Sequence, residues 1–159
     1  MEEIFTPDYT PREMLELGVF GGAYFSIDET FKERFPKKLF HNLSEKKYDL
    51  KKQNKTENCF KVLAGKSYEW WFERNLISDI DPLGWFEWYI HYYYGRRCYD
   101  DVRQIKRWNN FKKRQSSIYR KLILKSKYSI KEVNSNNNIY PGMKQSFIQW
   151  GIDLTNFSL

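Results

Sequence analysis

The clearest pattern of apolar and polar positions near the start of the chain predicts a short helix from Pro11 to about Gly18. Thr10 can accept a hydrogen bond at the helix start, Pro11 suits the first helical position, and Glu13 completes a capping box. Apolar residues follow on one side, and Gly18 is a natural helix end. The glycines that come next, in the stretch 18–22, predict tight backbone turns beside aromatic residues.

A second helix is predicted from Asp81 to Tyr94, because Asp81-Pro82 repeats the same start signal and Gly95 follows as a stop. Seven of its last ten residues, from Trp85 to Tyr94, are aromatic. A helix that is aromatic on most sides is typical of the centre of a core. We therefore expect this segment to lie at the centre of the molecule.

Further helices are predicted after Asp100 or Asp101, where Asp101 and Gln104 have capping-box spacing, and after Tyr140-Pro141. Between the apolar segments lie two polar stretches, 41–58 and 134–138, that have little to bury and that we expect to be exposed loops. The pattern predicts a mainly α fold: a compact single-domain helical bundle over residues 1–159, with long polar loops.

The composition excludes several classes of protein. Mean hydropathy is −0.78 and 30% of residues are charged, which argues against a membrane protein. The first residues lack the pattern of a secretory signal, so we expect a protein of the cytoplasm or of a host-cell interior. Cys59 and Cys98 have no partner at metal-ligand spacing, and His41 and His91 are isolated. We therefore expect no metal site, and nothing in the sequence indicates a cofactor.

The positive charge is concentrated in one segment. The chain carries a net charge of +7, and residues 84–125 alone contain 11 Lys or Arg and only three acidic residues. The rest of the chain is close to neutral. A local positive field favours an anionic partner such as nucleic acid or a phosphorylated ligand, although an exposed lysine face can also be no more than solvated.

Four rings in the predicted central helix are candidates for contact with a ligand: Trp88, Tyr89, Tyr92 and Tyr93. Each buried Tyr hydroxyl needs a hydrogen-bond partner, so this many tyrosines is costly in a purely structural helix. A partly open wall of tyrosine edges could stack a nucleobase or another planar ligand. The alternative is that most of these rings are core.

Arginines follow the aromatic segment and are candidates for binding phosphate or carboxylate, since the guanidinium group can bind such anions with two hydrogen bonds. The candidates are Arg96, Arg97, Arg103 and Arg107, with Gln104 beside them. The same arginines could equally pair with Asp100 and join two helices.

The motifs of this region resemble those of a family of small uncharacterised proteins. The resemblance rests on D-P-x-G-W-F-x-W-Y from Asp81, Y-Y-x-G-R-R from Tyr92 and D-D-x-R-Q-I-x-R-W from Asp100. Flanking motifs lie at 18–24 and 144–150. At position 91 this chain has His where the family pattern has Arg. The resemblance implies that these motifs fold together, and it implies no activity.

Three functions are compatible with these observations. The first is a nucleic-acid-binding protein in which the arginines hold phosphates and the rings stack bases. The second is a small enzyme acting on an aromatic or anionic substrate, such as a nucleobase, in which Glu87, His91, Asp100, Asp101 or a Tyr transfers a proton. The third is an interaction protein for an acidic partner. The sequence makes no prediction of oligomeric state.

Overall fold

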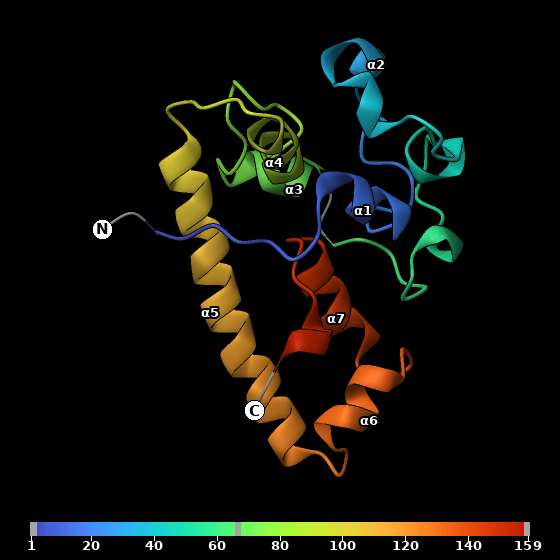
Figure 1. The fold of residues 1–159 in the computed structure, drawn as a ribbon, viewed down its shortest axis with the longest axis vertical. Coiled ribbons are helices and arrows are strands. Elements are labelled where there is room, and N and C mark those ends of the chain that lie inside the picture. Colours follow the sequence, from blue (N-terminus) through green and yellow to red (C-terminus); the bar gives the residue numbers. More distant parts are fainter. Residues whose placement is uncertain (1–2, 66–67, 158–159) are drawn as a thin grey trace.

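The computed structural model describes residues 3–65 and 68–157, and within these ranges it is built from helices and loops without a strand. Figure 1 shows α5 running along one edge of the molecule, with α4 and α3 near its first half and α7 and α6 near its second half. The predicted mainly α, compact helical fold is confirmed. The α-helices are α1 (Pro11–Glu16), α2 (Phe31–Arg34), α3 (Tyr68–Glu73), α4 (Trp85–Tyr93), α5 (Asp101–Lys125), α6 (Ile130–Ser135) and α7 (Pro141–Ile148). Four single 3₁₀ turns are η1 (Lys37–Leu39), η2 (Glu45–Lys47), η3 (Lys55–Glu57) and η4 (Leu154–Asn156).

The predicted start of α1 is confirmed in detail. The Thr10 side chain accepts a hydrogen bond from the Glu13 amide, and the Glu13 carboxylate accepts one from the Thr10 amide. Gly18 follows the helix with a φ of 65°, and the glycines at 21 and 22 also have positive φ. The tight turns predicted for this stretch are therefore present.

The predicted start of α4 was wrong by three to four residues. Asp81 does not cap the helix, because its two carboxylate oxygens accept hydrogen bonds from Arg96. The N-cap residue is Gly84, whose φ of 107° and ψ of −160° suit glycine, and α4 begins at Trp85. Residues 81–83 form a turn, closed by a hydrogen bond from the Gly84 amide to the Asp81 carbonyl.

The helix α5 has Asp100 at its N-cap position, but the predicted capping box between Asp101 and Gln104 is absent. The Asp101 carboxylate accepts hydrogen bonds from the Cys98 amide and from Trp88 Nε1. The Gln104 side chain donates to the Asp100 carboxylate. Asp101 thus ties α5 to Trp88 of α4 and to Cys98, Asp100 bonds side chains of α5 itself, and the first turn of the helix has no side-chain cap.

The core is one cluster that draws residues from both ends of the chain. The buried members of α4 pack against the N-terminal segment, α5 and α7, and aromatic rings make many of the contacts. Trp108 of α5 donates from Nε1 to the Trp150 carbonyl just after α7, which fixes these two helices to each other. The expectation that the aromatic segment lies at the centre of the molecule is confirmed.

The two polar stretches differ in how they are held. Within 41–58 lie η2 and η3, and the last residue, Asn58, is buried and donates to the side chain of Gln145. Within 134–138, α6 ends at Ser135, and positions 135–138 are exposed. In the part of the chain that the structure describes, no helix is both long and apolar enough to cross a membrane.

Candidate functional site

A cavity of about 560 Å³ lies between segments that are far apart in the sequence. Its walls come from the loop 20–27, from residues 51–53 and 63–65, from α3 and the loop after it, and from the turn that leads into α4. Arg107 of α5 and the residues Gln149 and Trp150 after α7 complete the wall. Volumes of roughly 300–1,000 Å³ are typical of small-molecule sites.

Arg107 is the arginine that lines this cavity. Its guanidinium donates to the Gln104 side-chain oxygen at 2.8 Å and to the Leu76 carbonyl at 3.4 Å. Among the described residues, no carboxylate forms an ion pair with it. Burial, together with the nearby charge of Arg103, lowers the pKa of Arg107 to about 10. The group therefore remains a cation at neutral pH, with its charge poorly compensated by the protein.

Two tryptophans, Trp150 and Trp85, lie near Arg107 in the wall of the cavity. The guanidinium of Arg107 lies 5.5 Å from the Trp150 ring centroid, and the rings of Trp150 and Trp85 are 4.9 Å apart. Both rings line the cavity. Trp85 Nε1 is buried without a hydrogen-bond partner among the described residues, so it is an unsatisfied donor inside the protein and not one exposed to the cavity.

The other arginines of the predicted set are engaged elsewhere. Arg96 makes two hydrogen bonds to the buried Asp81, at 2.7 and 2.6 Å. Arg103 makes two to Asp100, at 2.6 and 3.0 Å. Arg97 lies on the Tyr92 ring, 3.7 Å from its centroid. Of the two interpretations considered for the arginines, structural pairing describes Arg96 and Arg103, and only Arg107 faces a cavity.

Most of the predicted stacking wall is packed core. Trp88 is fully buried and donates from Nε1 to Asp101, and the buried Tyr89 donates its hydroxyl to the Tyr9 carbonyl. Tyr92 is half-buried under Arg97, and Tyr93 is exposed and does not belong to the cavity lining. Trp88 and Tyr89 thus belong to the core, which is the alternative given for these rings, because both are almost completely buried.

The four residues predicted to transfer protons do not line the cavity. Asp100 and Asp101 hold the start of α5, as described above. Glu87 is fully buried, and its carboxylate accepts hydrogen bonds from the Leu83 amide and from Arg34. His91 lies 3.7 Å from Glu87 and stacks on the Phe35 ring.

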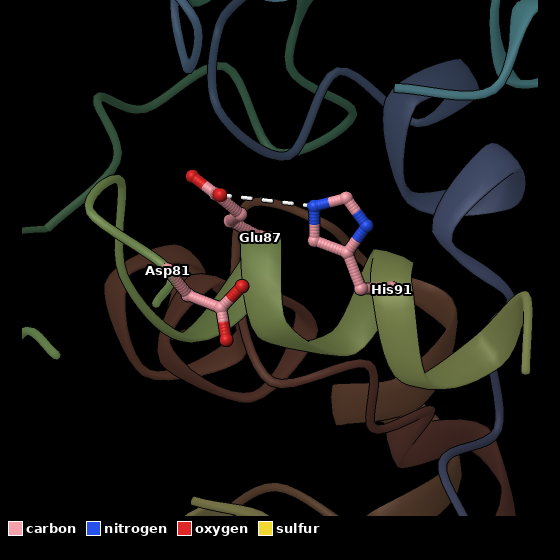
Figure 2. A group of neighbouring side chains, drawn as sticks. All are labelled: Asp81, Glu87 and His91. Carbon is pink, nitrogen blue, oxygen red and sulfur yellow. Dashed lines mark ion pairs between the residues drawn. The ribbon is translucent and has the colours of Figure 1, made fainter. Parts of the chain in front are cut away.

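Figure 2 shows Glu87 and His91 one turn apart on α4, with Asp81 entering from the preceding turn. One potential ligand atom from each of the three lies within 4.8 Å of the others, a grouping that the sequence analysis did not anticipate. Both carboxylates are already neutralised, Asp81 by Arg96 and Glu87 by Arg34. A cation here would have to displace two guanidinium groups, so the residues fit an ion-pair network better than a metal site.

The residues that make the cavity were not predicted from the sequence, above all Trp85, Gln149 and Trp150. A signal was present, since Gln149 and Trp150 lie in the flanking motif 144–150. What the sequence could not indicate is that this motif meets α5 and the 20–27 loop around one space. In comparisons with known proteins, no family model, no curated protein and no solved structure matches this chain.

Proposed function

We propose that this protein binds a small molecule that carries an anionic group and a planar ring, and that it does so in the cavity beside Arg107. The observation that carries the proposal is the partly buried guanidinium of Arg107, which faces about 560 Å³ of space without a carboxylate partner. A phosphate or carboxylate placed there would supply the missing charge and accept hydrogen bonds from the guanidinium.

The charge around the cavity supports an anion. Lys51 and Lys52 also line it and are exposed, so they can attract an anion to its mouth. Among the described residues of the lining, Glu69 is the acidic one, and it is exposed on α3. This described part of the lining therefore has three cations against one anion, which favours a negatively charged ligand.

The apolar part of the lining supports a planar ring. Trp85, Trp150 and Phe86 contribute ring surface, and the side chains of Leu76 and Leu83 add aliphatic surface. Planar ligands gain both dispersion energy and area burial against such walls. Because the four named acid–base candidates, Glu87, His91, Asp100 and Asp101, lie outside the lining, the proposal is for binding and assigns no reaction.

The test is ligand identification followed by a binding measurement. Native mass spectrometry of the purified protein would show a co-purifying small molecule, and tryptophan fluorescence would follow titration with nucleoside monophosphates and aromatic carboxylates. Replacing Arg107 by Gln should weaken binding of the best of these probes by about 10- to 100-fold, since a hydrogen bond to a charged group contributes roughly 1.5–3 kcal/mol.

Two control variants make this experiment specific. Arg97→Gln removes the same charge from an exposed arginine outside the cavity and should leave affinity unchanged. Ile27→Trp places bulk at an exposed position of the lining and should weaken binding without altering charge. The proposal fails if no probe binds, or if Arg107→Gln keeps native circular dichroism and binds the probe as well as the wild type.

A further inference from the structure

The outer face of α5 carries a row of cations that the cavity does not use. From Val102 to Lys125 the helix contains no acidic residue. Six of its basic side chains are exposed, and none of them forms an ion pair with a described residue. These are Lys106, Lys113, Arg114, Arg120, Lys121 and Lys125.

Their spacing places them on one side of the helix. Lys106, Lys113 and Arg120 are seven residues apart, which is close to two turns, so they form a line with about 10.5 Å between neighbours. Arg114 and Lys121 form a second line beside it with the same interval. The two lines give a rigid basic ridge, which we call the α5 ridge, about 28 Å long from Lys106 to Lys125.

The α5 ridge lies opposite the buried side of the helix, and of its residues Arg120 packs over the Phe157 ring, 5.4 Å from the ring centroid. Trp108, Tyr119 and Ile123 are buried against the core, and Figure 1 shows α5 at the edge of the molecule with the remaining helices on its inner side. A straight convex helix with cations along its outer face fits the spaced phosphates of a nucleic-acid duplex.

We propose that the α5 ridge binds the phosphate backbone of double-stranded nucleic acid without reading its sequence. The side chains of the ridge are mostly Lys, which acts on phosphate as a point charge, and the structure offers no recognition motif beyond charge. The nucleic-acid function predicted from the sequence is thereby assigned to residues other than the predicted arginines, two of which are held by carboxylates.

The same face is a poor match for a lipid surface. An interfacial helix inserts an apolar side between lipids, whereas the apolar side of α5 is already in the core. Three exposed apolar residues remain on α5, Val102, Ile118 and Leu124. They are separated along the helix and form no continuous patch.

The test measures binding of a fluorescent duplex of about 20 base pairs by anisotropy between about 50 and 200 mM salt, the range in which phosphate contacts change affinity most clearly. The ridge variant replaces Lys106, Lys113 and Lys121 by Gln. Because each lost phosphate contact removes about 0.9 from the slope of log affinity against log salt, the slope should become shallower by about 2 to 3. Affinity at the lowest salt should fall at least about 10-fold.

A matched variant replaces Lys37, Lys46 and Lys55 by Gln, three exposed lysines outside α5, so that the change in net charge is the same. It should change affinity by less than about two-fold, since its charges do not touch the duplex. An equal loss in both variants would show attraction to net charge alone and would overturn the ridge as a site. Absence of duplex binding at the lowest salt would overturn it as well.

Two further measurements distinguish this proposal from lipid binding and from ligand binding in the cavity. Strong binding to vesicles containing phosphatidylserine, with none to the duplex, would overturn the nucleic-acid assignment in favour of lipid. Arg107→Gln should bind the duplex like the wild type, because Arg107 faces the cavity and lies outside the ridge. The ridge and the cavity can therefore fail independently of each other.

Discussion

At the scale of single residues, the partly buried Tyr24 and the buried Tyr119 show how differently a hydroxyl can be accommodated. The Tyr24 hydroxyl donates to the Leu83 carbonyl at 2.8 Å and accepts from the Glu87 amide at 3.0 Å, which holds the turn before α4 in place. The Tyr119 hydroxyl is buried in α5 with no hydrogen-bond partner among the described residues. The Tyr24 hydroxyl therefore stabilises the folded state, whereas the unsatisfied Tyr119 hydroxyl destabilises it.

Replacing each of these tyrosines by Phe should change stability in opposite directions. Tyr24→Phe leaves a carbonyl and an amide without their partner, and should lower the free energy of unfolding by about 1–3 kcal/mol. Tyr119→Phe removes an unsatisfied polar atom and should raise it by about 1 kcal/mol. Urea denaturation followed by far-ultraviolet circular dichroism measures both. A loss of stability in Tyr119→Phe similar to that in Tyr24→Phe would contradict this account.

At the scale of elements, the sequence predicted correctly what depends on neighbouring residues and failed where a distant residue intervened. The start of α1 was predictable because Thr10 and Glu13 are three residues apart. The start of α4 was not, because Asp81 binds Arg96 fifteen positions away, which no local pattern indicates. The predicted capping box between Asp101 and Gln104 is absent for the same reason, because the Asp101 carboxylate accepts a hydrogen bond from Trp88.

The candidate site was predictable only in part, again for reasons of distance. Charge pattern identified Arg107 as one of four arginines, but it could not separate that residue from Arg96 and Arg103, which differ only in having carboxylate partners. The cavity itself is made by segments up to about 130 residues apart, from Phe20 to Trp150. A space of that kind follows from tertiary packing, which the hydrophobic pattern of one sequence does not specify.

Two glycines give a prediction at this scale, because they occupy opposite environments. A Cβ atom at Gly18, whose φ is 65°, would lie 1.7 Å from the Glu57 carbonyl oxygen, so the backbone around it would have to move. A Cβ atom at Gly142 in α7 would meet nothing within 4 Å. Gly18→Ala should lower the free energy of unfolding by more than about 2 kcal/mol, whereas Gly142→Ala should raise it by about 0.4–1 kcal/mol.

Thermal and urea denaturation of the two alanine variants, each compared with the wild type, measure these changes. The pair is its own control, since the same atoms are added in both. If Gly18→Ala were as stable as the wild type, the close approach of the 18–22 stretch to the 57–58 backbone would be wrong.

At the scale of the whole molecule, the two proposed sites make use of one helix. Arg107 lies seven residues before Arg114, on the same line of α5 as Arg114 and Lys121, and differs from them in that it lines the cavity and donates to Gln104 and Leu76. The inner side is held by aromatic packing against α7 and by the hydrogen bond from Trp108 to Trp150. Because a ring-rich core supports both sites, the stability of that core sets the conditions under which either site can bind.

That core predicts a steep loss of stability in alkali. Burial, with the nearby charge of Asp153, raises the pKa of Tyr9 to about 12, and burial with the neighbouring Tyr140 raises that of Tyr119 to about 12. Burial also raises the pKa of Tyr24 and of Tyr89 well above 10, the value in the unfolded chain. A raised pKa in the folded state means that the folded protein keeps protons that the unfolded chain releases. The contribution of these groups is therefore complete below pH 10 and is lost as pH rises through about 12.

Lys144 acts in the opposite sense and moderates this loss. Its ammonium group is buried and donates to the Val133 and Asn136 carbonyls, and burial lowers its pKa below 10.5. A lowered pKa makes the folded state release its proton first, so that this one group favours folding as pH rises towards 10.5. Arg107, whose pKa is lowered to about 10, acts in the same sense as Lys144. With four tyrosines against these two groups, the net change above pH 10 is destabilising. The midpoint of urea denaturation should fall between pH 10 and about 12, together with the rise of tyrosinate absorbance. Tyr119→Phe should make the fall less steep, whereas a midpoint independent of pH over this range would show that the buried tyrosines ionise as freely as in the unfolded chain.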